Sequence, residues 1–139
     1  MAAQQGRALL LKKGSGSGSP ETFDTVAGLR TKTVSLNAES VDITNADSSG
    51  AWRELLADGG VRSARLSGAG VFKDEAADEA VRLSFFTQTI GNWQAVIPDF
   101  GTLEGPFQIV ALEYGGAHDG EVTVSLTLES AGALTFTAL

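Results

Sequence analysis

The chain has one histidine, His118, which stands in a glycine-rich segment beside Asp119. A histidine that is oriented by an aspartate can act as a general base, but catalysis then needs a nucleophile for it to activate. No motif places such a nucleophile, and the chain contains no cysteine. A single histidine also cannot build the usual zinc site, which draws on several histidine or cysteine ligands. We therefore interpret His118 as a residue of a turn or of an interface.

The segment from Asp42 to Asp47 reads DITNAD and offers side-chain oxygens at alternate positions, as a calcium-binding loop does. The glycine and the later bidentate glutamate of that loop do not fall at the required positions. Aspartate and asparagine in this arrangement more often accept hydrogen bonds from the backbone two residues on. We expect Asx-type turns here, and no metal.

Two further patterns imitate functional sites. Lys12 and Lys13 precede the glycines of KKGSGSG, whereas a phosphate-binding loop ends in GK[ST]. Four carboxylates cluster where a helix should begin, and negative charge is favourable at that end of a helix. We expect a solvated face instead of an acid–base pair; its residues are Asp74, Glu75, Asp78 and Glu79. The sequence thus predicts no enzymatic activity and no cofactor, and favours a structural or binding role.

Length and charge limit the class of protein further. The 139 residues predict one domain spanning the whole chain, 1–139, with a substantial core. Seventeen acidic residues against ten basic ones give a net charge of −7, which argues against a protein that grips nucleic acid by its phosphates. It does not argue against a protein that lets nucleic acid slide past. No apolar run approaches the roughly 20 residues that cross a bilayer, so we expect no membrane span. The run from Ala8 to Leu11 is too short for a signal peptide.

Alternating apolar and polar residues predict a mainly β protein. In Glu121–Ser130, one face carries Val122, Val124, Leu126 and Leu128, which should enter the core. The only good helix is expected at Asp74–Gln88, with Asp74 as its cap. The other expected strands are Arg7–Lys13, Thr22–Ala27, Arg30–Ala38, Arg62–Phe72, Trp93–Pro98, Glu104–Tyr114 and a last one that takes Leu134 and Phe136 into the core.

Two loops interrupt this pattern. Gly14–Pro20 has the composition of a flexible linker and is expected to be a mobile loop, either native or engineered. The segment Val41–Gly60 is long for a loop in a small domain, and such loops are usually functional. Its Trp52, Leu55 and Leu56 are spaced as in one or two helical turns that Ser49 could cap. If the domain offers these side chains no surface to cover them, another subunit must.

The order of these segments resembles the major tail tube protein of long non-contractile phage tails and of phage-like gene transfer agents. The resemblance rests on four stretches that together cover nearly the whole chain: VDITNADSSGAWRELLADGGVRSARLSGAGVFKD from Val41, TVAGLRT from Thr25, IPD from Ile97 with GPFQ from Gly105, and EYGGAHDGE from Glu113 with LESAGAL from Leu128. It implies a fold of two antiparallel sheets, a sandwich or partial barrel, flanked by one α-helix. It also implies hexameric rings that stack into a tube and form the channel for DNA delivery into a bacterial cell.

The resemblance implies sites by position. The loop at about 41–60 should touch the neighbouring ring, through Val41, Asp42, Trp52, Leu55 and Leu56. The polar face of the strand at Glu121–Ser130 suits the channel wall, because it offers small groups and negative charge and has no lysine or arginine to hold phosphates. The lumen-facing residues are then Glu121, Thr123, Ser125, Thr127 and Glu129.

The resemblance also implies partners and a location. The partners are further copies of the chain, the tape measure, tail terminator and distal tail proteins, and DNA in transit without specific binding; no membrane is involved. The protein would belong to the tail of a phage or phage-like particle assembled in the bacterial cytoplasm.

Two alternatives stay open. One is the tube protein of a contractile injection system, which shares the fold and differs mainly in having an outer sheath. The other is a β-sandwich tail module that binds carbohydrate or a receptor. Such a module should expose an aromatic platform, whereas Trp52 and Trp93, the only tryptophans, look better placed for packing.

Overall fold

The computed structural model describes residues 9–18, 21–26, 28–57, 59–73, 76–116 and 118–138. Within these ranges the chain forms eight strands, one α-helix and one short 3-10 turn at Ser49–Ala51. The strands are β1 (Leu10–Gly18), β2 (Glu21–Thr25), β3 (Leu29–Ala38), β4 (Arg62–Val71), β5 (Gly91–Ile97), β6 (Gly101–Gly116), β7 (Val122–Ser130) and β8 (Thr135–Ala138), and the helix α1 is Ala76–Thr87.

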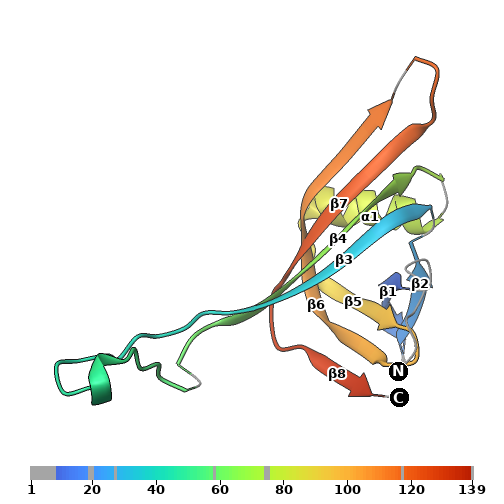
Figure 1. The fold of residues 1–139 in the computed structure, drawn as a ribbon. Helices are drawn as coiled ribbons and strands as arrows, with labels where there is room; N and C mark the ends of the chain where they lie inside the picture. Colours follow the sequence, from blue (N-terminus) through green and yellow to red (C-terminus); the bar gives the residue numbers. More distant parts are fainter. Residues whose placement is uncertain are drawn as a thin grey trace.

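The strands form one antiparallel sheet in the order β2-β1-β5-β6-β7-β4-β3, with β8 also paired to β6 (Figure 1). Strand β6 holds the sheet together because it is long enough to serve two sets of neighbours. Its residues 101–107 pair with β5, and its residues 107–116 pair with β7. The expected mainly β, antiparallel fold with one helix is therefore confirmed. The two expected sheets, however, are two halves of a single sheet that does not close into a barrel.

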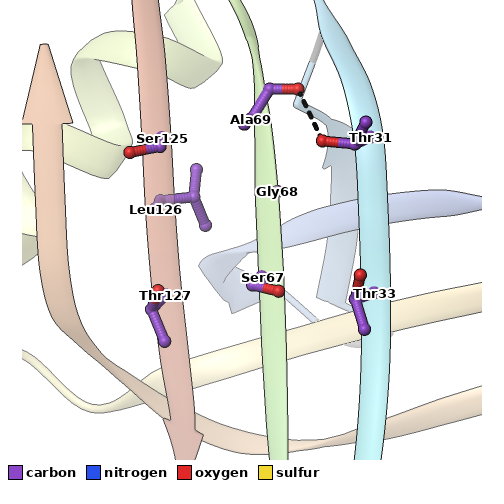
Figure 2. A pocket seen from close by; sticks show the side chains of 8 residues that line it. All are labelled: Thr31, Thr33, Ser67, Gly68, Ala69, Ser125, Leu126 and Thr127. Carbon is purple, nitrogen blue, oxygen red and sulfur yellow. Dashed lines mark hydrogen bonds between the residues drawn. The ribbon is translucent and has the colours of Figure 1, made fainter.

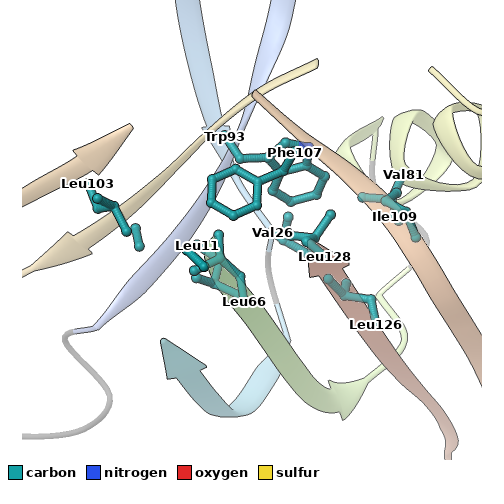
Figure 3. Packing of buried hydrophobic residues seen from close by; sticks show 12 residues of the cluster. Leu11, Val26, Leu66, Val81, Trp93, Leu103, Phe107, Ile109, Leu126 and Leu128 are labelled. Atoms are coloured by element: carbon teal, nitrogen blue, oxygen red, sulfur yellow. The ribbon is translucent and has the colours of Figure 1, made fainter. Parts of the chain in front are cut away.

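The core lies between these two halves (Figure 3). Alternation along β7 buries Val124, Leu126 and Leu128, as its sequence predicts, because successive side chains of a strand point to opposite faces. Trp93 of β5 and Phe107 of β6 are also buried, with Trp93 only 1% exposed. The other core members come from strands on both sides, and from Val26 just after β2: Leu11, Val26, Ala64, Leu66, Ala95, Leu103 and Ile109.

Helix α1 covers one side of this core by packing against β6. Its apolar face brings Val81 into the core, with Phe85 partly buried beside it. This agrees with the helical spacing of these residues in the sequence. The expected cap Asp74, its neighbour Glu75 and the side chain of Ala77 lie outside what the structure describes.

Three local features depart from a simple continuation of the sequence pattern. Strand β1 continues through Gly18, across an irregularity in its pairing with β2, so residues 14–18 of the expected loop are strand. Ser19 and Pro20 lie outside the described residues, and the mobility of this segment stays a prediction. The β6–β7 register shifts between Ile109 and Ala111, and Val110 is exposed at this irregularity. Phe136 does not enter the core, although the sequence predicted that it would. It is exposed and packs against Phe100 instead, at a centroid distance of 5.2 Å, so the prediction is wrong.

Candidate functional site

The structure supports the non-catalytic interpretation of His118. His118 and Asp119 both lie exposed in the turn between β6 and β7, and neither side chain has a hydrogen-bond or ion-pair partner in the described ranges. A general base needs both an orienting partner and a nucleophile within hydrogen-bond reach. The described residues also contain no group of three His, Cys, Asp or Glu side chains that could hold a metal ion.

The DITNAD segment forms Asx turns, as expected. The Thr44 amide donates to Asp42 Oδ1 at 2.8 Å, and the Asp47 amide donates to Asn45 Oδ1 at 2.8 Å. The pKa of Asp42 is lowered from its ordinary value, first by the hydrogen bond from the Thr44 side chain and then by that from the Thr44 amide. One side-chain oxygen each of Asp42 and Asn45 is thus used to hold the backbone turn.

The acidic cluster at the start of α1 is not a uniformly solvated face. Glu79 is exposed, but Asp78 is buried, so the expectation is wrong for Asp78. Tyr114 of β6 lies close by, and its pKa is raised, first by burial and second by the negative charge of Asp78. Tyr114 also contacts Phe72 edge-on, at a centroid distance of 5.6 Å.

The most unusual feature of the molecule is the arm, residues 39–61, which continues the β3–β4 hairpin far beyond the sheet (Figure 1). Backbone hydrogen bonds hold its two sides together, from the Glu39 amide to Val61 O at 2.8 Å and from the Ile43 amide to Glu54 O at 3.0 Å. An isolated bridge also pairs Asp42 with Leu55. The expected helical turns reduce to the 3-10 turn at Ser49–Ala51, because Leu55 is engaged in this cross-arm pairing.

The arm exposes an apolar surface that its own domain does not cover. Every residue from 39 to 57 is exposed, apart from the half-buried Ser48, and Trp52 is 77% exposed. Large apolar side chains on one protruding segment indicate a contact surface for a partner. We call this set the arm patch: Val41, Ile43, Trp52, Leu55, Leu56 and Val61. Ile43 and Val61 were not among the residues expected from the sequence, although Val41 and Ile43 already stand at strand spacing.

A second surface is the outer side of strands β3, β4 and β7, opposite the core. Strand register brings Thr33, Ser67 and Thr127 into one row and Thr31, Ala69 and Ser125 into the next. Their short side chains line a shallow furrow, in which the Thr31 hydroxyl donates to Ala69 O at 3.4 Å (Figure 2). We call these six residues, together with Thr123, Glu121 and Glu129, the polar face.

Charges on the polar face differ from the sequence-based expectation. Neighbouring strands bring arginines beside both glutamates: Arg65 lies 3.0 Å from Glu129, and Arg30 lies 2.8 Å from Glu121. The strand itself carries no lysine or arginine, as the sequence states, but β3 and β4 bring Arg30 and Arg65 beside it. Strand β7 alone could not reveal this, because the partners come from β3 and β4. Val122 also departs from the pattern, because it is exposed where β7 begins.

The sheet leaves edges open. Strands β2 and β3 stand at the two ends of the strand order, so each has one edge without a partner strand in the described part of the chain. An open edge pairs readily with another chain unless it is covered. The molecule thus combines open edges, a protruding apolar arm and a face of small polar groups, and no described cluster suits catalysis.

Comparison with known proteins accounts for this combination. Residues 3–136 match the family described as phage tail tube protein. The chain belongs to the phage tail tube protein family. No curated protein sequence matches it.

Solved structures of similar proteins agree with the family. A chain from the tail of an empty gene transfer agent particle, refined with C6 symmetry, is 52% identical, with a TM-score of 0.92 over 98% of this chain and 100% of that one. A chain from the virion of a native gene transfer agent particle is 50% identical, with a TM-score of 0.88 and the same coverage. The SPP1 tail tube, at 12% identity, shares the fold, with a TM-score of 0.64 over 94% of this chain and 76% of that one.

This tail tube protein is a structural subunit. Its open strand edges and its exposed arm patch fit a protein that assembles with other chains better than one that acts as a monomer. The described part of the chain contains no helix long and apolar enough to cross a membrane. The arm patch includes most of the residues that the sequence predicts to contact a neighbouring ring, and the polar face includes those that it predicts to face the lumen.

Proposed function

We propose that this tail tube protein forms six-membered rings that stack into a tube, and that DNA passes through the tube into a bacterial cell. The observation that carries the proposal is the 52% identity, over nearly all of both chains, with a protein from the C6-symmetric tail of a gene transfer agent particle. Identity at this level, with a TM-score of 0.92, supports the same subunit shape and hence the same contacts between copies.

In this proposal the arm joins consecutive rings. Val41, Asp42, Trp52, Leu55 and Leu56 contact the neighbouring ring, and Ile43 and Val61 extend the same patch. Covering these side chains removes apolar surface from water, which is favourable at about 25 cal/mol per Å². The arm needs little refolding for this contact, because backbone hydrogen bonds already join its two sides.

Within a ring, the open sheet edges provide the contacts between neighbours. The polar face then lines the lumen, with Glu121, Thr123, Ser125, Thr127 and Glu129 among its residues. Short hydroxyl side chains present no large obstacle and no fixed positive charge to a passing polyanion. A face of large apolar side chains would favour a buried surface, whereas the small polar groups observed here favour a solvated one.

The remaining parts of the proposal concern the particle. The tube subunit has no enzymatic activity and binds DNA only in transit, and it meets the tape measure, tail terminator and distal tail proteins at the ends and inside of the tube. It is assembled into the tail in the bacterial cytoplasm. A carbohydrate-binding module is less well supported, because Trp93 is buried and only Trp52 is exposed, so no platform of several tryptophans exists.

Labelling the subunit in the native particle tests the proposal. A short epitope fused to this chain, detected by antibody in negative-stain micrographs, should mark the tail shaft along its length at regular intervals. Label on the head or the baseplate with a bare shaft would refute the tube assignment. Particles that carry the untagged chain serve as the control for non-specific antibody.

A further inference from the structure

The two ion pairs of the polar face stand at opposite ends of strand β7. Arg65–Glu129 marks one end and Arg30–Glu121 the other, with the furrow of small side chains between them. Glu129 follows Glu121 by eight positions, which corresponds to about 26 Å along a strand. The furrow therefore runs between two arginines, each of which has a carboxylate in contact.

These pairs contribute little to folding. The side chains of Arg65 and Glu129 are 58% and 48% exposed, and those of Arg30 and Glu121 are 68% and 52% exposed. Exposed ion pairs gain little because water screens the attraction and both side chains lose freedom. Stabilisation of the fold therefore does not explain well why both arginines lie beside glutamates on this face.

An unpaired arginine on a surface that DNA must slide past would be costly for transport. A guanidinium holds phosphate oxygens through parallel, charge-assisted hydrogen bonds. A carboxylate oxygen at 2.8 to 3.0 Å lies against the guanidinium of each arginine and offsets its charge. The arginines in turn offset two of the three glutamates on this surface, since register also places Glu113 of β6 opposite Ser125. The face is left with one net negative charge per subunit.

We propose that Glu129 and Glu121 shield Arg65 and Arg30 from the phosphates of passing DNA, which keeps the channel wall nearly neutral and free of phosphate-binding sites. The proposal rests on the proposed function, because it requires the polar face to line the channel. It names the residues that would bind DNA if their partners were removed. The wall then does more than repel DNA. It contains arginines that could bind phosphate, and their glutamate partners prevent this binding.

Tubes assembled from Glu129→Gln protein test the proposal with a short fluorescent DNA duplex as the probe. Glutamine keeps the size and loses the charge, so six arginines per ring become available. The variant tubes should retain duplex at low salt. Six phosphate contacts lose on the order of 10³-fold in affinity between about 50 and 200 mM salt, so the retention should vanish over that range. Glu121→Gln, acting on the other pair, provides an independent second measurement.

Two controls separate shielding from a general change in charge. Glu79→Gln removes one negative charge from the exposed surface of α1, on the core side of the sheet, and should leave duplex retention at the level of the unaltered tube. The double variant Arg65→Gln/Glu129→Gln loses both members of the pair and should also return to that level. Retention by Glu129→Gln alone, abolished in the double variant, is the expected result.

The outcomes distinguish this proposal from the proposed function. If Glu129→Gln and Glu121→Gln tubes both retain no more duplex than Glu79→Gln tubes, shielding is refuted while tube formation stands. If the double variant retains as much as Glu129→Gln, Arg65 is not the site and shielding is refuted for that pair. If epitope label on the native particle leaves the tail shaft bare, the proposed function itself fails.

Discussion

The amide of Leu56 donates a 2.8 Å hydrogen bond to the carbonyl of Val41, while both side chains stay exposed. This contact shows how the arm is built: hydrogen bonds across the arm satisfy part of its backbone, and its apolar side chains have no cover from their own domain. Because its backbone is already partly ordered, such a surface loses little conformational entropy when a partner covers it. The arm is therefore the part of the molecule where assembly and folding can be separated by mutation.

Trp52→Ala is expected to block tube assembly and to leave the subunit folded. Trp52 is mostly exposed, so its removal should change the free energy of unfolding by no more than about 0.5 kcal/mol. In an interface, truncating a buried tryptophan commonly costs about 2 kcal/mol or more per contact. Leu55→Ala should act in the same direction. Electron microscopy of assembly reactions, with circular dichroism of the subunit, gives both readouts.

Arg53→Ala is the matched control, because it lies on the arm between Trp52 and Leu55 and removes no part of the arm patch. It should assemble normally. Hydrogen exchange decides whether the premise is right: amides of the arm should exchange faster than those of β7 in the subunit and slow down in the tube. An arm as protected in the subunit as the core strands would contradict the account.

Leu66→Ala and Leu36→Ala should differ sharply in stability. Leu66 is fully buried in β4, and replacing a buried leucine with alanine costs about 2–5 kcal/mol. Leu36 of β3 is 67% exposed, and its replacement should cost about 0.5 kcal/mol or less. Chemical denaturation of both variants makes the measurement. Equal losses would mean that β3 is covered in the isolated subunit.

Asp42 is expected to titrate below its ordinary pKa of 3.8, because the hydroxyl and amide of Thr44 stabilise its carboxylate. A depressed pKa in the folded state means that this stabilisation is complete above the unfolded value and is lost as pH falls through the folded one. The turn at the base of the arm should therefore loosen only in acid. NMR titration of the Asp42 carboxyl checks this, with Thr44→Val raising the midpoint and Thr44→Ser restoring it. A midpoint at or above 3.8 in the unaltered protein would contradict the hydrogen-bonding assignment.

Thr127→Lys should build tubes of normal length that deliver DNA poorly. It places six positive charges per ring at one height of the proposed wall, and each phosphate contact must break before the DNA can move. Thr87→Lys is the matched control, since Thr87 lies exposed at the end of α1, on the other side of the sheet. Transfer assays on particles shown to contain each variant give the comparison. Equal delivery by both would place the polar face outside the channel.

Periodicity in the sequence was sufficient for most of the fold. The alternation of Val124, Leu126 and Leu128 predicted their burial, and the helical spacing of Val81 and Phe85 predicted the face that α1 turns to the core. Both patterns are local, and one buried face fixes them. The irregularity at Val110 was not predictable. It arises from the pairing of β6 with β7, where β6 has one extra residue, and the apolar–polar alternation within either strand does not reveal such a residue.

Long-range pairing explains the other differences. Whether the strands form two separate sheets or one joined sheet depends on which strands pair with β6. No local pattern in Gly101–Gly116 predicts that β5 pairs with its first part and β7 with its second. The partners of Glu121 and Glu129 come from β3 and β4, more than 60 residues earlier in the chain. In the arm, Trp52 was identified from its type and setting, while its helical spacing misled, because the cross-arm pairing of Leu55 draws the segment into an extended form.

A helical reconstruction of the native tail by electron cryo-microscopy, at a resolution that identifies side chains, tests the central claim most directly. The account predicts six copies of this chain in each ring, with each arm reaching an adjacent ring and Trp52 covered there. A shaft built from a different protein, or arms that lie against their own subunit with Trp52 still exposed to solvent, would contradict it.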